Sequence, residues 1–335
     1  MPGISTDLLE ELERVLPGRV RSRSSDRLAY AHDASHYLLV PSVVVSPEDT
    51  NQVAQLMALC TRSGAPLTFR SGGTSLSGQA TANGVLADVR QGFRRLRVLD
   101  DGASVRVEPG ATVRQVNVLL ARYGRKLGPD PASEIACTIG GVVANNSSGM
   151  VCGTEFNTYH TLESAVLVLP SGTIVNTADA DADAELQRRE PELCAGLLRL
   201  KDRIRRNPES VAQLTRLHQI KNTMGYGLNS FLDYDTPLGI LLHLVVGSEG
   251  TLAFVAEATF RTIALNRYCG TGLLVFESLE EATRCLPALV ESGFAAIELF
   301  DSTSLRVTQR LDGAEDVLPA FTVENHAALL VEFQE

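Results

Sequence analysis

The pattern of apolar and polar positions predicts short helices and strands along most of the chain. Leucines and valines recur at helical spacing over residues 5–16, and Pro17-Gly18 ends that helix. Val43 to Val45 is a short β-branched strand, and a second amphipathic helix begins at Thr50 and stops at Gly64. The N-terminal part of the chain is therefore expected to pack helices against strands.

A glycine-rich loop follows the next expected strand. The segments 65–69 (APLTF) and 84–89 (GVLADV) have strand character, and the loop between them does not open a long helix. The segment 104–110 (SVRVEPG) predicts another strand, and Thr112 caps a helix that reaches Arg122 or Tyr123.

The second half of the chain changes character near residue 267. Before it, Pro170-Ser171-Gly172 predicts a hairpin turn. Further along, two apolar segments on either side of residues 247–250 predict two strands joined by a turn at those residues, and His243 is expected to be a core histidine in the first of these strands. After it, the pattern is strand, helix, strand, which indicates a second domain. Residues 328–335 have strand character, so we expect the chain to be a fragment of a longer protein.

Composition and charge exclude several classes of function. The net charge of -10 argues against a nucleic-acid partner, and no apolar run approaches the roughly 20 residues of a membrane span. The six cysteines form no CxxC pair, so we expect reduced thiols and neither a metal site nor a disulfide framework. With no secretory signal at the N-terminus, a cytoplasmic location is expected, and peripheral attachment to a membrane stays open.

Common catalytic and nucleotide signatures are absent. The chain has no Walker loop, no GxGxxG between a strand and a helix, no GxSxG elbow and no HExxH. The loop FRSGGTSLSGQ (69–79) nevertheless combines glycines, which allow successive N–H groups to point into one concavity, with hydroxyl donors and one arginine. Such a loop suits a pyrophosphate, although a flexible glycine–serine loop explains the residues equally well.

A second segment favours the ligand interpretation. Residues 136–154 (ACTIGGVVANNSSGMVCGT) contain no charged side chain, and their glycines, hydroxyls and amides suit a large, flat ligand with polar edges. A buried, turn-rich core would explain the small residues. It would not explain two adjacent asparagines, which need hydrogen-bond partners when buried.

Seven motifs occur in an order that resembles a known family. PSVVVSP, PLTFRSGGTSLSGQA, LGPDPAS, CTIGGVVANNSSG, CGTEFNT, LVLPSGTIV and VVGSEGTLAF resemble FAD-linked oxidoreductases of the vanillyl-alcohol-oxidase (PCMH) fold. They are most similar to the D-lactate, glycolate and D-2-hydroxyglutarate dehydrogenase branch, and to its long bacterial members with an iron–sulfur half. The resemblance implies an α+β fold: an N-terminal helical segment (1–36), a PCMH-type FAD-binding domain (37–265, subdomains 37–100 and 101–265) and the start of an α/β cap domain with an antiparallel sheet (266–335).

The resemblance also implies which residues bind the cofactor. The first loop would hold the FAD pyrophosphate, the second segment would contact the ring and ribityl chain, and the turn at Glu249 and Gly250 would close over the cofactor. A histidine for covalent attachment is missing from the first loop, so we expect non-covalent FAD, with His160 as the residue that keeps the alternative open. The implied pyrophosphate loop comprises Arg70, Ser71, Gly72, Gly73, Thr74, Ser75, Ser77 and Gly78, and the second set comprises Pro131, Ala132, Thr138, Gly140, Gly141, Asn145, Ser148, Gly149 and Thr154.

The implied reaction is the oxidation of a D-2-hydroxy acid by hydride transfer to flavin N5. The family's substrate arginines, metal-binding histidines and active-site histidine have no counterpart before residue 335, so Tyr226 is the one candidate on the substrate side and no metal ligand is assigned. Electrons would pass to an iron–sulfur domain (with a 4Fe-4S cluster in a part beyond this chain), a quinone or a carrier protein, and homo-oligomerisation is left open. The alternatives are a non-catalytic flavin-binding module for electron relay and an NADPH-dependent reductase on the same fold.

Overall fold

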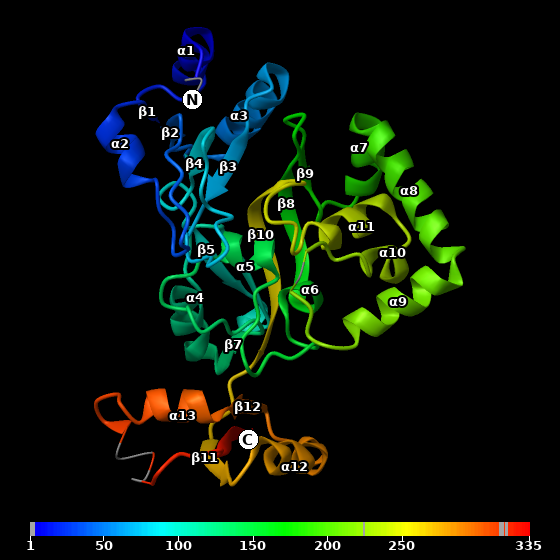
Figure 1. Cartoon of the computed structure of the whole chain (residues 1–335). Coiled ribbons are helices and arrows are strands. Elements are labelled where there is room, and N and C mark those ends of the chain that lie inside the picture. Colours follow the sequence, from blue (N-terminus) through cyan, green and yellow to red (C-terminus); the bar gives the residue numbers. More distant parts are fainter. Residues whose placement is uncertain (1–3, 224, 315–317, 319–320) are drawn as a thin grey trace. The chain divides into compact units, whose positions relative to one another are not determined.

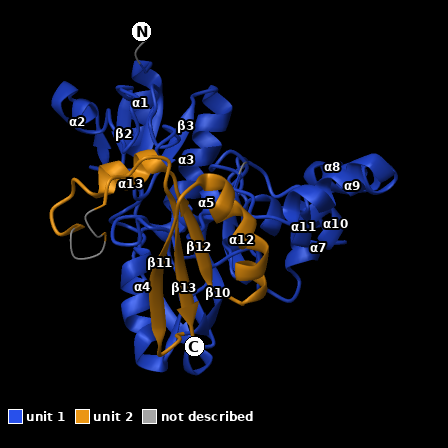
Figure 2. Ribbon diagram, turned by 60° about the horizontal axis from the view of Figure 1, so that its bottom comes forward, with its two compact units in different colours: residues 1–264 blue, residues 265–335 orange. Residues whose placement is uncertain are grey.

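The computed structural model describes residues 4–223, 225–314, 318 and 321–335. It divides into two compact units, residues 1–264 and residues 265–335, which are coloured separately in Figure 2. Among the described residues, unit 1 combines helices with two sheets and unit 2 combines helices with one, and the chain has an α+β fold (Figure 1).

The first sheet of unit 1 is mostly parallel and has the order β1-β2-β4-β3. Its strands β2, β4 and β3 run parallel, whereas β1 pairs antiparallel with β2. Leu12 and Leu16 near one end of α1 and Leu56 of α3 bury their side chains against the sheet. The predicted strands and both helices are confirmed, with Gly64 in the left-handed conformation as the C-cap of α3. The bounds are α1 Thr6–Val15, β1 Val20–Arg21, α2 Ser24–Ala29, β2 Val43–Val45, α3 Thr50–Ser63, β3 Leu67–Arg70 and β4 Val85–Asp88.

The second sheet is antiparallel and has the order β5-β6-β10-β8-β9, with β7 also paired to β10. The predicted hairpin at residues 170–172 joins β8 to β9, and the helix expected from Thr112 is α4, which continues as a 3₁₀ turn to Tyr123. The bounds are β5 Leu96–Leu99, β6 Ser104–Val107, α4 Val113–Leu120, β7 Arg125–Leu127, β8 Leu162–Val168, β9 Ile174–Asn176 and β10 Phe254–Ala264.

One prediction about this region is wrong. The apolar segment that precedes Gly247 is the helix α11 (Pro237–Leu244) and not a strand. Thr236 accepts the Gly239 N–H as an N-cap and Pro237 occupies the first turn, which are helix-start signals. A short run of apolar residues does not distinguish a buried helix from a buried strand, because both lack an alternating polar face.

Helices cover the remaining part of unit 1. The helix α7 follows β9, and α8 and α9 come next as a helical pair, seen beside α10 and α11 in Figure 1. No helix in the described ranges is both long enough and apolar enough to cross a membrane. All six cysteines are free thiols in the structure. The bounds are α5 Ile139–Asn145, α6 Thr158–Thr161, α7 Ala182–Arg189, α8 Pro191–Arg205, α9 Pro208–His218 and α10 Ser230–Asp233.

Unit 2 contains the predicted strand, helix and strand, followed by a further helix and by the strand expected at residues 328–335. Its sheet is antiparallel, with β13 between β11 and β12 (Figure 2). Leu286 and Leu289 of α12 pack on Leu329 and Val331 of β13, so the unit has a small core of its own. The bounds are β11 Cys269–Phe276, α12 Leu279–Glu291, β12 Ala296–Phe300, α13 Ser302–Thr308 and β13 Ala327–Gln334.

Candidate functional site

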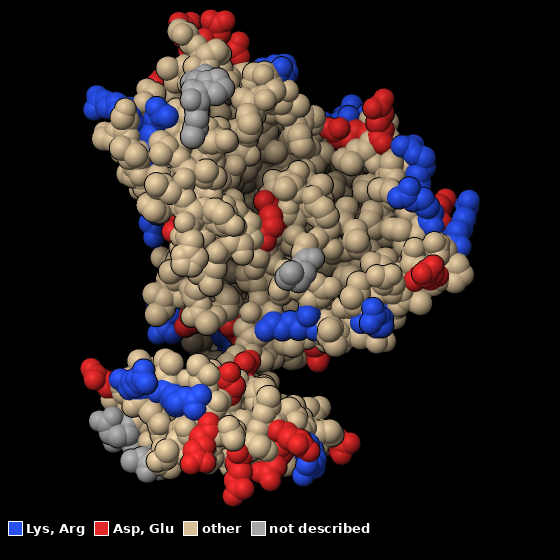
Figure 3. Space-filling model, viewed as in Figure 1, with Lys and Arg blue, Asp and Glu red and all other residues tan. Residues whose placement is uncertain are grey.

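Unit 1 contains a cavity of about 810 Å³. Its wall brings together the glycine-rich loop after β3, the N- and C-terminal parts of α5 and the turn at residues 247–250, which are far apart in the sequence. Of the described residues that line it, only Lys221 and Glu249 carry a charge. In Figure 3 the charged side chains of this unit lie mostly towards the margins of the face shown. The cavity therefore has the size and the mainly neutral wall of a small-molecule or cofactor site, which typically measures about 300–1,000 Å³.

The first loop is fixed at both ends by its own chain. At its start, the Ser71 hydroxyl donates to the Pro109 carbonyl over 2.7 Å, and the Gly72 N–H donates to the Thr138 hydroxyl over 2.8 Å. At its end, the Arg70 guanidinium donates through Nε and Nη2 to the Ala80 carbonyl at 2.9 and 2.5 Å. Arg70 is 5% exposed and does not line the cavity, so its hydrogen bonds brace the loop from outside.

Two glycines of the loop need the left-handed backbone region. Gly73 has φ of 67° and Gly78 has φ of 82°, and a Cβ on Gly78 would come within 2.5 Å of the Tyr37 ring. The Gly73 carbonyl also accepts the Ala34 N–H at 3.0 Å, so the segment between α2 and β2 helps to hold the loop. These contacts give the loop a defined shape, in contrast to the flexible-loop alternative.

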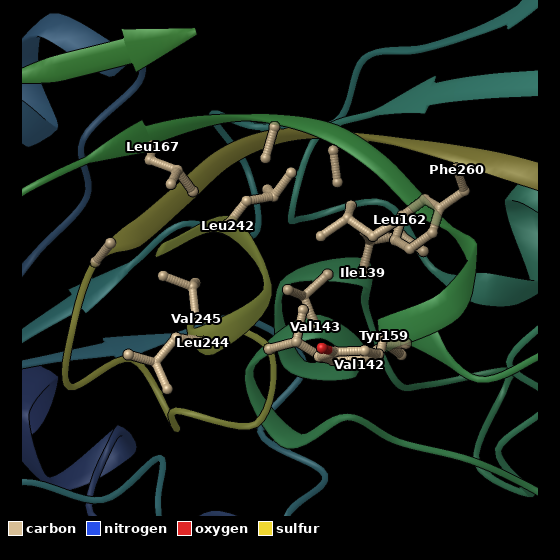
Figure 4. Close-up of a cluster of buried hydrophobic side chains, with 14 of the residues drawn as sticks. Ile139, Val142, Val143, Tyr159, Leu162, Leu167, Leu242, Leu244, Val245 and Phe260 are labelled. Atoms are coloured by element: carbon tan, nitrogen blue, oxygen red, sulfur yellow. The ribbon is translucent and has the colours of Figure 1, made fainter. Parts of the chain in front are cut away.

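The helix α5 is anchored on one side and faces the cavity on the other. Ile139, Val142 and Val143 are buried in the core beside residues of α11, β8 and β10 (Figure 4). The other side of the helix lines the cavity. Residues with helical spacing share a face, and this face consists of Gly140, Gly141, Ala144 and Asn145. A Cβ on Gly140 would lie 2.7 Å from the Pro109 Cβ, whereas a Cβ on Gly141 meets nothing within 4 Å. The sequence indicated a ligand-facing segment here but did not predict a helix.

Asp130 organises the segment after α5. Its carboxylate accepts the backbone N–H groups of Gly149, Val151 and Cys152 at 2.9, 2.9 and 3.2 Å. Gly149 is packed so closely that an added Cβ would lie 1.8 Å from the Asp130 carbonyl oxygen. The Lys221 ammonium donates to the Gly149 carbonyl over 2.7 Å. Gly149 thus supports the wall of the cavity without lining it.

Glu249 lies where the three parts of the wall meet. Its backbone has φ of 52°, a left-handed conformation that is uncommon outside glycine, and its N–H donates to the Ala144 carbonyl at 2.8 Å. Its Oε1 accepts the Asn145 side-chain amide at 2.6 Å and the Gln79 amide at 3.4 Å. Burial raises the pKa of this carboxyl, and the two amide hydrogen bonds oppose the rise.

Two hydroxyls of the wall have no hydrogen-bond partner among the described residues. Ser148 Oγ and Ser248 Oγ are buried from solvent and make no hydrogen bond within the described residues, although both residues line the cavity. Buried hydroxyls are normally hydrogen-bonded, so these two are available to a ligand or to water. No histidine is among the described lining residues, and burial raises the pKa of Cys137, the one thiol there, which keeps it protonated.

The residues singled out from the sequence divide into three groups. Gly78, Ala132, Gly149, Thr154 and Arg70 lie outside the cavity wall. Tyr226 lies beside it, because its hydroxyl is 2.8 Å from the hydroxyl of Thr251, which lines the cavity. The structure brings together in the wall Ser71, Gly72, Gly73, Thr74, Ser75, Ser77, Pro131, Thr138, Gly140, Gly141, Asn145, Ser148, Glu249 and Gly250.

Sequence reasoning missed several lining residues. Gln79, Ser147 and Ser248 all lie within quoted motifs, and their polar side chains were the available signal. Phe254 is the last residue of the quoted motif VVGSEGTLAF, and Val255 follows it in β10 with no signal beyond strand character.

The histidine of the apolar segment is a core residue, although in a helix and not in a strand. His243 is 6% exposed, its Nε2 lies 2.8 Å from the Tyr234 hydroxyl, and its Nδ1 lies 3.0 Å from the Gly239 carbonyl. Both ring nitrogens are therefore satisfied, and burial lowers the pKa of the imidazole. Across the described ranges, no group of three or more His, Cys, Asp or Glu side chains is placed to hold a metal ion.

Comparison with known proteins gives two domain matches. The FAD binding domain family matches residues 41–178, and the C-terminal domain family of FAD linked oxidases matches residues 265–335. The chain is 28% identical to a D-2-hydroxyglutarate dehydrogenase of Escherichia coli K12 over 90% of this chain and 30% of that protein. It is 26% identical to a D-lactate dehydrogenase of Archaeoglobus fulgidus over 91% of this chain and 58% of that protein. It is also 27% identical to the glycolate oxidase subunit GlcD of E. coli K12 over 98% of this chain and 55% of that protein.

The chain thus spans about a third of the dehydrogenases of D-2-hydroxyglutarate and just over half of the other two relatives. A solved structure of alkyldihydroxyacetonephosphate synthase has the same fold, with a TM-score of 0.67 and 16% identity over 99% of this chain and 58% of that one. Both domain matches and the fold agree with the motifs in the sequence. The chain contains the FAD binding domain and the C-terminal domain of FAD linked oxidases, and it has the vanillyl-alcohol-oxidase (PCMH) fold.

Proposed function

We propose that the cavity of unit 1 binds FAD without a covalent bond. The observation that carries the proposal is that one cavity is lined by both segments selected from the sequence, the loop at 71–77 and the α5 segment at 138–148. The donor set fits the cofactor: backbone amides and hydroxyls of the loop suit a pyrophosphate, and no acidic residue of the loop would repel it. The orphaned hydroxyls of Ser148 and Ser248 supply further donors for the ribityl chain or the ring.

The absence of histidine from the described wall supports non-covalent binding. Gly141 supports a flat ligand beside α5, because its missing side chain leaves open space on the cavity side of the helix. Arg70 and Gly78 would act by shaping the loop, and Gly149 by fixing the segment after α5, since these residues lie behind the wall. Ala132 and Thr154 also lie outside the wall, so no direct contact with the cofactor is proposed for them.

We further propose that the chain is part of a dehydrogenase for D-2-hydroxy acids. The names of the three relatives point to a substrate of the D-2-hydroxyglutarate, D-lactate or glycolate type. FAD supplies the acceptor of the hydride when it is bound. The residues of this wall hold and orient the cofactor and exclude water from it, and Tyr226, next to Thr251, is the candidate for a substrate contact. The electrons would pass to an iron–sulfur domain, a quinone or a carrier protein.

The reaction is tested by anaerobic reduction. The FAD-loaded protein is mixed with D-2-hydroxyglutarate, D-lactate or glycolate, and the flavin absorbance near 450 nm is followed. Bleaching by one of these acids, and not by its L-enantiomer where one exists, is the expected result. Bleaching by NADPH alone would favour a reductase, and a flavin that only a reduced carrier protein bleaches would favour an electron-relay module. Either result would overturn the dehydrogenase proposal.

A further inference from the structure

A chain of five hydrogen-bonded side chains runs through the wall of the cavity. Ser75 donates to the side-chain carbonyl of Gln79, and Ser147 donates to that of Asn145 at 3.0 Å. The amide groups of Gln79 and Asn145 in turn donate to the same oxygen of Glu249. All five residues line the cavity. This series of hydrogen bonds links the glycine-rich loop to the segment at the end of α5 through one carboxylate.

The direction of these hydrogen bonds is fixed. Each amide places its carbonyl oxygen against a serine hydroxyl and its NH₂ group against Glu249, because an ionised carboxylate can only accept. An ionised carboxylate is an acceptor with no donor of its own, and it suits a point where two donors converge. Hydrogen bonds to such a charged acceptor are roughly twice as strong as those between neutral groups.

The backbone conformation indicates that the side chain of Glu249 is needed. Its φ of 52° would suit glycine, and glycines with positive φ flank it at 247 and 250. A non-glycine residue in this region costs free energy, so an observed outlier is grounds for a functional hypothesis. In the described part of the chain, Glu249 forms no ion pair, and its Oε2 accepts no hydrogen bond from the protein. This position thus combines a strained backbone with a half-buried carboxylate that has no ion-pair partner among the described residues.

We propose that Glu249 is a positioning residue that fastens the glycine-rich loop to the end of α5 and so closes the cavity over its ligand. The bond to Asn145 is short and holds the carboxylate on α5, whereas the bond to Gln79 is long at 3.4 Å. The loop side is therefore where this clasp, formed by Gln79, Glu249 and Asn145, opens when a ligand enters or leaves. The inference rests on the proposed function in that FAD is the ligand used to test it.

The test uses three variants. Glu249→Gly removes the carboxylate and relieves the positive φ, so the fold is expected to be at least as stable as that of the wild type. Glu249→Gln keeps one acceptor oxygen without the charge. Glu163→Gln is the matched control, because Glu163 also accepts a side-chain donor, the Ser104 hydroxyl at 2.9 Å, but does not line the cavity.

Two quantities are measured. Hydrogen exchange of the amides in residues 71–80 reports on the loop, and the recovery of free-flavin fluorescence after dilution gives the rate of FAD release. We expect Glu249→Gly to raise both rates about 2- to 10-fold, because the loop loses the long hydrogen bond from Gln79 and one hydrogen bond makes a modest net contribution to stability. Glu249→Gln should show a smaller increase in both, and Glu163→Gln none. Melting of the flavin-free proteins should show no loss of stability in either Glu249 variant.

The outcomes separate this inference from the proposed function. A wild-type protein that binds no FAD would overturn the proposed function, while the loop exchange of the flavin-free variants would still test the clasp. A wild type that binds FAD, with exchange and release unchanged in Glu249→Gly, would overturn the clasp alone. A Glu249→Gly protein that loses FAD only because it unfolds would also overturn it, since the residue would then serve the fold and not the closure.

Discussion

Replacement of Gly141 should separate cofactor binding from stability. Gly141 lies in α5 and lines the cavity, and a Cβ built on it meets no atom within 4 Å. Alanine at this position therefore adds a methyl group to the space proposed for FAD without touching the protein. Glycine within a helix is less stable than alanine by roughly 0.5–1 kcal/mol, so Gly141→Ala should stabilise the flavin-free fold by up to about this amount.

The same substitution should weaken the binding of FAD. One added methyl in a closely packed contact typically costs about 1–3 kcal/mol. If the ligand packs against α5, its Kd should rise about 5- to 150-fold, because each 1.4 kcal/mol is a factor of ten. The larger Gly141→Leu should abolish binding at micromolar FAD. The assay is quenching of flavin fluorescence for Kd and thermal unfolding of the flavin-free protein for stability.

Gly196 provides a matched control for this experiment. It also lies inside a helix, α8, its Cβ would have only the flexible Arg199 guanidinium within 4 Å, at 3.8 Å, and it does not line the cavity. Gly196→Ala should therefore give a similar rise in melting temperature with an unchanged Kd. Wild-type affinity in Gly141→Leu, with the fold intact, would refute the placement of the ligand against α5.

Four further changes have definite expected outcomes. Gly149→Ala should destabilise the fold by about 3 kcal/mol or more in denaturant unfolding, because its Cβ would lie 1.8 Å from the Asp130 carbonyl oxygen. Asp130→Ala leaves three backbone N–H groups without their acceptor, so it should cost at least about 1–3 kcal/mol and speed hydrogen exchange at residues 149–152. The folded state raises the pKa of Glu249, so the stability of the wild type relative to Glu249→Gln should fall as pH rises from the unfolded value near 4.5 through the folded pKa; a flat difference would contradict this. Burial lowers the pKa of His243, so the stability of the wild type relative to His243→Gln should fall as pH falls through 6.5, in urea titrations across that range.

Much of the fold was predictable because its signals are local. The helix α3 has an Asp49 N-cap, an apolar stripe and a terminal Gly64, and each of these can be read within a few residues. The same holds for the strands of the first sheet and for the hairpin between β8 and β9. The helix α11 was missed although Thr236 and Pro237 mark its start, because its uniformly apolar sequence outweighed the cap signals.

The site was predictable at the level of segments and not of individual roles. Glycines and an absence of charge indicated which two segments face a ligand, yet the sequence does not show which glycine faces the cavity and which faces the protein. Gly141 is open on the cavity side, whereas Gly140 approaches Pro109 and Gly149 approaches Asp130. Likewise, nothing local distinguishes Arg70 as a brace on the Ala80 carbonyl from a ligand contact, because that depends on how the loop folds back.

The convergence on Glu249 is a purely tertiary feature. Gln79, Asn145 and Glu249 are separated by 66 or more residues in the chain, and only the folded arrangement brings two amides onto one carboxylate. A motif scan marks each residue separately and does not reveal this contact.

The most direct test of the central claim is a crystal structure of the chain grown with FAD. The account predicts density for one FAD in the cavity of unit 1. Its diphosphate should lie beside the backbone amides of residues 72–77, its ring system should lie beside Gly141, and no covalent bond should join it to a protein side chain. Cofactor density in another part of the molecule, a covalent link to His160, or an empty cavity at saturating FAD would contradict it.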